Sequence, residues 1–450
     1  MKQFIQTIQN IWKIDELRQR ILTTLGLVLI YRLGSYVVLP GVDTTKLEGF
    51  SSQASEGILG LIDVFSGGAF HNASIFALGI MPYITASIIV QLLGMAVPYF
   101  QKMQKEGESG RKRMNQITRY LTVAVTALQA PGYLAGANQL APGALPDTSF
   151  FWVSSTIILV AGTMFVMWLG EKITDRGLGN GISLIIMIGI ISRLPGALLQ
   201  EFNGRLTDAG GGLVIFLVEM VILLLIIVTV ILLVQGTRRI PVQFAKKIIG
   251  NKQYGGNRNY IPLKVNAVGV MPIIFAQAII LIPVYIIGYA QVESASISGV
   301  SAAIADYTGF WHNLFLAFLI IVFTYFYTAI MINPNQMAED MKKNGGFVPG
   351  IKPGKKTAEF IDAVMSRITL PGALFLAFVA ILPSIAQLAG VNSGFAQFFG
   401  GTSLLILVGV VLDTLQQIES YLLMRHYDGL MKSGRIKGRA TNSPVSMAQQ

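Results

Sequence analysis

Long apolar runs recur along this chain from residue 21 to residue 423, and polar segments separate them. A helix needs about 20 mostly apolar residues to cross the roughly 30 Å hydrocarbon layer of a membrane. Ten stretches meet or nearly meet this requirement, so the pattern predicts ten transmembrane helices. Their approximate bounds are 21–40, 74–98, 120–140, 150–170, 181–199, 213–234, 268–290, 310–332, 370–389 and 402–423.

Basic residues support this count independently of hydropathy. The third stretch is the weakest, because Gln129, Pro131, Gly132 and Asn138 interrupt it. With ten spans and a cytoplasmic N-terminus, 30 of the 34 lysines and arginines lie on the cytoplasmic side, where membrane proteins concentrate these residues. Without the third span, every later loop would change sides. We therefore expect ten spans, with both termini in the cytoplasm.

Ten spans divide into two sets of five, and an odd number of spans per half inverts the second half relative to the first. Inverted halves are common in transport proteins whose path lies between them. We therefore predict an all-α membrane protein with two inverted five-helix halves around a central pore. The expected parts are an amphipathic cytoplasmic N-terminus 1–20, an N-terminal half 21–200, a C-terminal half 201–425 and a cytoplasmic tail 426–450.

The segment 57–70, GILGLIDVFSGGAF, is apolar but too short to span a membrane, and it contains Asp63. Such short apolar segments are commonly re-entrant or interfacial. Non-helical backbone at membrane depth is tolerated only where protein or a water-filled cavity covers it. The segment therefore predicts a short re-entrant helix beside a pore.

Composition favours one membrane domain, since 53% of the residues are apolar and 13% are charged, against about 25% charged in soluble domains. The absence of cysteine excludes disulfides and thiolate metal sites. The first 20 residues contain no continuous apolar core, so we expect no cleaved signal peptide.

The sequence contains no pattern that indicates catalysis. His71, His312 and His426 lie far apart near span ends, and the segment 346–357 lacks the glycine spacing of a phosphate-binding loop. We therefore expect no enzyme activity, no cofactor and no metal site. Energy would come from a partner or an ion gradient.

Four charged residues lie within the predicted spans or near their ends: Arg32, Glu219, Asp413 and Glu419. They could form an ion pathway, or they could face the helix bundle and pair there. No span carries two acids opposite a base at matching depth, so the sequence favours pairing.

Two cytoplasmic loops, 235–267 and 333–369, are long enough to indicate a function. The turn-rich centre GNKQYGGNRN of the first lies between QFAKKI and YIPLKV and predicts a hairpin. The lysines and arginines of both loops could bind RNA or an acidic partner, or they could serve only to orient the chain in the membrane.

Seven long strings carry a resemblance to the SecY family, in that family's order and spacing. They are DVFSGGAF, ASIFALGIMPYITASIIVQLL, KEGESGRKR, GTMFVMWLGEKITDRGLGNGIS, PLKVNAVGVMP, FVPGIKPG and GGTSLLILVGVV. The resemblance covers nearly the whole chain. It implies an hourglass channel in the bacterial plasma (inner) membrane, whose two halves open like a clam shell. Its substrates would be unfolded secretory polypeptides, and membrane-protein helices would leave it sideways.

The resemblance also assigns residues to the pore. A plug that closes the outer funnel would comprise Leu61, Ile62, Asp63, Val64, Phe65, Ser66, Gly67, Gly68, Ala69 and Phe70. A pore ring would comprise Ile80, Ile84, Ile182, Ile186, Ile274 and Ile406. Two of these pairs are spaced i, i+4 and so share a helix face. An apolar ring excludes water yet fits any passing chain, although an isoleucine in so apolar a chain more commonly faces lipid or a neighbouring helix.

A lateral gate would lie between the second and seventh spans, where the polar or helix-bending residues are Pro82, Thr85, Ser87, Gln91 and Gln277. Hydrogen bonds at such a seam would break at modest cost, since they contribute on average less than about 1 kcal/mol each in membranes. The same residues equally fit ordinary helix packing.

The cytoplasmic loops would dock the ribosome, with ribosomal RNA contact, or the SecA motor ATPase. The docking residues would be Arg238, Arg239, Lys246, Lys247, Lys342, Lys343, Lys352, Lys355 and Lys356. Lys352 stands where the family usually has arginine, so the charge remains but the bidentate fork is lost. Further implied partners are the SecE and SecG subunits, secretory preproteins with their signal sequences, and membrane lipid.

The alternative to a polypeptide channel is a secondary transporter of small solutes. A transporter should carry polar or ionisable groups on broken helices at the membrane midplane. Here the candidate constriction consists of isoleucine, which favours the channel.

Overall fold

The computed structural model describes residues 12, 14–46, 63, 65–146, 148–207, 212–244, 247–249, 252–254, 258–266, 269–277, 279–280 and 308–432. The elements of the first half are α2 (Asp15–Gly34), η1 (Thr44–Lys46), α5 (Met81–Ala96), α6 (Pro98–Lys105), α7 (Glu108–Leu140), α8 (Ser149–Arg176) and α9 (Gly181–Thr207). The later elements are α10 (Gly212–Gln235), β1 (Thr237–Phe244), β2 (Lys247–Ile249), β3 (Lys252–Tyr254), β4 (Arg258–Lys264), α13 (Phe310–Met331), α14 (Pro334–Lys343), β5 (Gly346–Phe347), α15 (Lys355–Leu388), α16 (Ser393–Ala396) and α17 (Gly401–Lys432).

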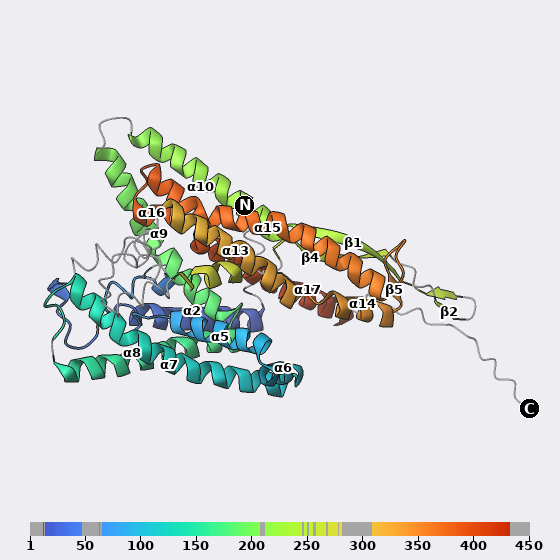
Figure 1. Ribbon diagram of the computed structural model, residues 1–450, viewed down its shortest axis with the longest axis horizontal. Helices are drawn as coiled ribbons and strands as arrows, with labels where there is room; N and C mark the ends of the chain where they lie inside the picture. Colours follow the sequence, from blue (N-terminus) through green and yellow to red (C-terminus); the bar gives the residue numbers. More distant parts are fainter. Residues whose placement is uncertain are drawn as a thin grey trace, which may run out of the picture.

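The long helices form two groups (Figure 1). Helices α2, α5, α7 and α8 lie together on one side of the molecule, and α10, α13, α15 and α17 lie together on the other. Helix α9 runs between them and contacts α2 and α8 in the first group and α10 and α17 in the second. Helix α9 therefore packs against both groups.

Helices occupy nine of the ten predicted span positions. Six are long and apolar enough to cross a membrane, and α5 with α6 gives a seventh if the pair, bent by 100°, counts as one span. Only part of the predicted span 268–290 is described. Within that part, residues 271–277 and 279–280 are helical. The structure is therefore that of a multi-pass helical membrane protein.

Four helix starts differ from the predicted ones, and the first is that of α2, which begins at Asp15 instead of residue 21. Helices α7 and α15 begin at Glu108 and Lys355, before the apolar runs, because the polar residues ahead of those runs form helix without a break. Helix α5 begins later than predicted, at Met81. The residues before it form turns, with positive φ at Ala73 and Gly79. Apolarity alone therefore located the spans better than their ends.

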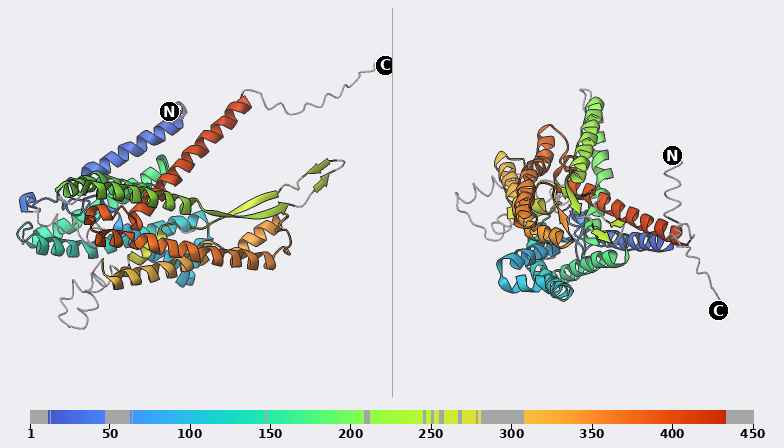
Figure 2. Two further views of the ribbon diagram at one scale, coloured as in Figure 1. Left: turned by 90° about the horizontal axis from the view of Figure 1, so that it is seen from above. Right: turned by 90° about the vertical axis from the view of Figure 1, so that its right-hand side faces the viewer.

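The predicted hairpin is confirmed. Strands β1 and β4 are antiparallel, with Thr237 opposite Lys264, and β2 and β3 continue the same register. Strand β5 adds to the free edge of β1, so Phe347 lies opposite Gln243. The hairpin projects beyond the ends of the helices (Figure 2).

The two long loops form one structural module. A small apolar core joins the hairpin to the second loop and to α15, and its buried members are Ile240, Val242, Leu263, Met341, Val348, Ile361 and Met365. Because α15 continues from this core through the helix group, a force on either loop would reach the second helix group directly.

Candidate functional site

Six isoleucines from four separate segments meet in one apolar cluster. Ile80, Ile186 and Ile406 are buried in it, and Ile84, Ile182 and Ile274 pack against it half-buried. The segments are the start of α5 with the turn before it, the helical residues 271–277, α9 and α17. The structure thus brings together all six residues that the sequence analysis grouped as a pore ring.

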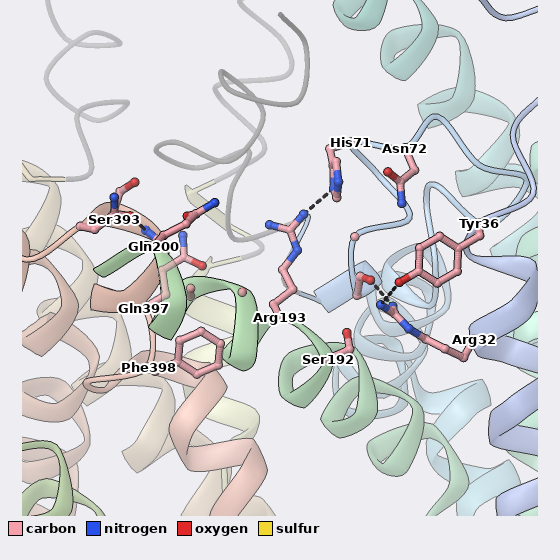
Figure 3. A pocket seen from close by; sticks show the side chains of 16 residues that line it. Arg32, Tyr36, His71, Asn72, Ser192, Arg193, Gln200, Ser393, Gln397 and Phe398 are labelled. Atoms are coloured by element: carbon pink, nitrogen blue, oxygen red, sulfur yellow. Dashed lines mark hydrogen bonds between the residues drawn. The ribbon is translucent and has the colours of Figure 1, made fainter. Parts of the chain in front are cut away.

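Two cavities lie on either side of this cluster along α9. Ile182, Ser183 and Ile186 of α9 line a cavity of about 480 Å³ on the hairpin side, where Lys264 of β4 is also in its wall. Ile84, Ile274 and Ile406 line the same cavity. Residues 192–200 line a second cavity of about 600 Å³ at the other end of α9 (Figure 3). At a rise of 1.5 Å per residue, the part of α9 between them is about 9 Å long. The apolar layer between the two cavities is therefore thin.

The second cavity is far more polar than the isoleucine layer. Its walls carry Arg32 and Tyr36 from the end of α2, His71, Arg193 from α9, and Gln397 from the segment before α17. The hairpin-side cavity has a mixed wall, in which Ser87, Gln91, Asn180, Lys264 and Asp413 accompany the isoleucines. Both cavities are large enough to hold water.

Part of the segment 57–70 packs against the isoleucines. Phe65 and Ala69 belong to the same cluster as the isoleucines, while Gly67 and Gly68 face the second cavity. Gly67 and Gly68 have φ angles of +66° and +90°, which favour glycine. Of the predicted plug residues, Leu61, Ile62 and Val64 lie outside the described residues.

Close backbone contact seats this segment against α9. A Cβ atom built on Gly189 would lie 3.1 Å from both the Gly67 nitrogen and the Phe65 oxygen, and one built on Gly67 would lie 2.7 Å from the Gly189 Cα. Only glycine at both positions allows so close an approach. Two side chains of α2 also hold the segment's carbonyls: Tyr31 donates to Ser66 at 3.0 Å, and Arg32 donates to Gly67.

A charge cluster adjoins the same segment. The Asp63 carboxylate is completely buried and forms an ion pair with Arg193. It also accepts from the His71 backbone N–H at 3.0 Å and lies 3.0 Å from His71 Nδ1. Arg193 was not a candidate in the sequence analysis, because periodicity does not show which acid an isolated arginine will meet.

Helix α5 meets the second helix group along a seam of aromatic and amide side chains. Ile88, Phe275 and Tyr327 form its buried core, and the rings of Phe275 and Tyr327 meet edge to face at 5.2 Å. Tyr327 Oη donates to Gln91 Oε1, and Gln91 Nε2 donates weakly to Ser87 Oγ at 3.4 Å.

The remaining predicted gate residues have other neighbours. Thr402 Oγ1 donates to Gln277 Oε1 at 3.3 Å, which joins residues 271–277 to α17. Thr85 bonds to the Met81 carbonyl of its own helix, and Pro82 occupies the first turn of α5. Among the described residues, Gln91 is therefore the predicted gate residue whose side chain forms a hydrogen bond across the seam. Its partner Tyr327 was missed, because 236 residues separate the two.

A buried ion network joins α9 to the second helix group. Arg205 Nε lies 2.8 Å from Glu201 Oε1, and Arg205 Nη2 lies 2.6 Å from Glu219 Oε1 of α10. Arg205 also donates to the Gly390 carbonyl at 2.8 Å, and the Asn392 N–H donates to Glu201. The predicted pairing of Glu219 within the bundle is therefore confirmed, and its partner is Arg205.

The predicted docking residues lie together at the hairpin end. Arg238 and Arg239 are exposed on β1, and the exposed lysines of the second loop are Lys342, Lys343, Lys352, Lys355 and Lys356. Lys247 lies in β2, and Lys246 lies outside the described residues. Within the described ranges, no three His, Asp or Glu side chains could together hold a metal ion.

Comparison with known proteins points in one direction. A model of the SecY family matches residues 74–415. The chain is 43% identical over 434 residues to the protein translocase subunit SecY of Streptomyces coelicolor, covering 94% of this chain and 98% of that one.

Solved structures show the same fold at lower identity. One titled "The structure of a protein conducting channel" aligns with a TM-score of 0.63 at 17% identity, covering 94% of this chain and 95% of that one. Sec61 in a canine ribosome-channel complex from the endoplasmic reticulum aligns with a TM-score of 0.59, also at 17% identity and with the same coverage.

The Gly67–Gly189 contact predicts the effect of a larger residue on α9. Gly189→Val should unseat the segment 65–70, because overpacking costs about 1–3 kcal/mol. We expect amide hydrogen exchange in this segment, followed by mass spectrometry in detergent, to become about tenfold faster. Gly196→Val is the matched control, since nothing lies within 4 Å of a Cβ at Gly196 on the same helix. Equal exchange in the two variants would contradict the contact.

Proposed function

The chain belongs to the SecY family, and on that premise we propose that it is the pore-forming subunit of a protein-conducting channel. It moves unfolded secretory polypeptides across the membrane and releases membrane-protein helices sideways into lipid. The observation that carries this proposal is the apolar cluster of six isoleucines from four segments, which lies beside two cavities that both have α9 in their walls.

The six isoleucines form the pore ring of the proposed channel. A narrow apolar passage loses its water and so blocks ions at rest. Branched aliphatic side chains make no hydrogen bonds, so they accept a passing chain whatever its sequence. This lack of preference suits a channel for many different polypeptides, whereas a solute transporter needs a polar binding site near the midplane. The transporter alternative is therefore not supported.

The segment 61–70 acts as the plug. Phe65 and Ala69 pack in the isoleucine cluster, and Gly67 and Gly68 line the second cavity, so the segment would have to leave before a chain could pass. The second cavity, with a volume of about 600 Å³, offers adjoining space for such a movement.

The seam between α5 and residues 271–277 with α13 acts as the lateral gate, through which signal sequences and membrane anchors reach lipid. Its polar bonds are few, and bonds of this kind in membranes average about 0.6 kcal/mol. The halves 21–200 and 201–425 would part there, as two inverted sets of five helices, while the ion network of Arg205 ties α9 to α10.

The hairpin module acts as the docking platform for the ribosome or the SecA motor ATPase, and SecE and SecG would complete the complex. Its exposed lysines and arginines lie on one rigid unit, and one structural neighbour is a ribosome-bound channel by its title. This end would face the cytoplasm of a bacterium, with both termini on the same side of its inner membrane, as the 30 basic residues predicted for that side require.

Reconstitution tests the proposal directly. We expect lipid vesicles that contain the chain with its partner subunits to take up a secretory precursor when the motor ATPase and ATP are supplied. The precursor should then resist added protease until detergent is added, whereas vesicles without the chain should give no protection. Vesicles that protect no precursor but accumulate a small solute along an ion gradient would contradict the channel.

Charge reversal tests the docking platform. Lys352→Glu should lower the rate of precursor uptake about fivefold, which corresponds to roughly 1 kcal/mol of lost charge contact. Lys437→Glu is the control, because it makes the same change in the tail. Uptake should be measured at several motor concentrations, and equal effects of the two reversals would rule out the assigned role of Lys352.

A further inference from the structure

We propose that Arg193 is a positioning residue that locks the plug closed through its ion pair with Asp63. The proposal rests on the proposed function, because it concerns how the resting channel stays shut. It differs from the contacts that the ring makes, since it assigns a specific charged partner on α9 to the plug.

The buried carboxylate of Asp63 requires this partner. Its exposed fraction is zero, while the Arg193 side chain is 21% exposed. Removing one partner of a buried ion pair is strongly destabilising, because the other charge is left without compensation. His71 also lies against Asp63, but it belongs to the same stretch of chain as the plug. Arg193 therefore provides the ionic link from the plug to the α9 wall.

The position of Arg193 gives the lock a route to open. Arg193 lines the second cavity and reaches toward His71 across it (Figure 3). When the plug leaves, the guanidinium can be hydrated at once from this cavity, and Asp63 can leave together with His71. The ion pair therefore resists spontaneous departure of the plug. When the plug does leave, the Arg193 guanidinium lies in the cavity and is not left as an unsolvated charge among apolar side chains.

Orientation in the membrane does not explain Arg193. It is one of the four basic residues outside the cytoplasmic segments, together with Arg32, Lys46 and Arg205. In the structure all four have local partners: Arg32 binds the Gly67 carbonyl, Lys46 binds Gly143 and Asp43, and Arg205 binds two glutamates. Two of the four, Arg32 and Arg193, hold the plug. Arg32 bonds only to backbone there, so Arg193 is the one whose effect depends on a plug side chain.

Cysteine labelling tests the lock, because the natural chain contains no cysteine. Ser66→Cys places a single thiol on the plug at a site that is 1% exposed. Labelling by a membrane-impermeant maleimide should be slow in the resting channel, in vesicles without substrate or motor. Adding Arg193→Gln should make labelling at least about tenfold faster. Arg119→Gln is the matched control, since it breaks an ion pair with Glu171 between α7 and α8, and it should leave the labelling rate unchanged.

A second background separates the charge from packing. If Arg193 acts through Asp63, then Arg193→Gln should change the labelling rate less than about twofold when Asp63 is already Asn. An equal acceleration in both backgrounds would show that Arg193 does not act through Asp63 and would overturn the lock. Slow labelling of the Arg193→Gln channel in the Asp63 background would also overturn it.

The thermal midpoint of each variant in detergent shows whether it is folded. A midpoint that falls for Arg193→Gln but not for the double variant is a further result that the lock predicts, because only the single change leaves Asp63 without its cation. Failure of the proposed function would appear separately, as absent precursor uptake by the unsubstituted chain, since labelling is read without any substrate.

Discussion

An apolar cluster must keep two cavities apart that lie about 9 Å from each other along α9, and the rest of the structure depends on this constraint. The six isoleucines and the plug residues Phe65 and Ala69 belong to this cluster, and most of the isoleucines also line one of the cavities. No single helix could supply such a cluster. It requires four segments to converge, and α9 runs through their centre because its small residue Gly189 lets the plug backbone come close.

The same cluster has to open, and the bonding of its two edges differs accordingly. At the α9–α10 edge, a buried network of one guanidinium and two carboxylates ties α9 to α10, and Gln417 of α17 accepts from the Gly179 N–H at 2.8 Å. At the seam, aromatic contacts and the Gln91–Tyr327 hydrogen bond take over. Breaking the buried charges would cost far more than parting the seam. The seam is therefore the edge at which opening costs less.

Much of this arrangement could be predicted from the sequence, though not all of it by the same reasoning. Hydropathy located nine helices, and the turn-rich centre of 235–267 gave the hairpin, because both signals are local. The i, i+4 spacing put Ile182 and Ile186 on one face, but their meeting with Ile406 depends on tertiary packing and came only from the family resemblance. Arg193, Arg205 and Tyr327 were missed for the same reason, since their partners lie in other segments. The helix starts at Glu108 and Lys355 were predicted too late in the chain, because hydropathy does not distinguish a polar helix from a polar loop.

The most direct test of the central claim is to place a photoreactive residue at Ile84, Ile186 or Ile274 while a secretory chain is stalled in transit. The account predicts crosslinks to the stalled chain from all three positions and none from exposed positions on the same molecule, such as Leu224 of α10. A verified intermediate that gave no crosslinks from the three isoleucines would show that the polypeptide passes elsewhere, and it would contradict the assignment of the isoleucine layer as the pore.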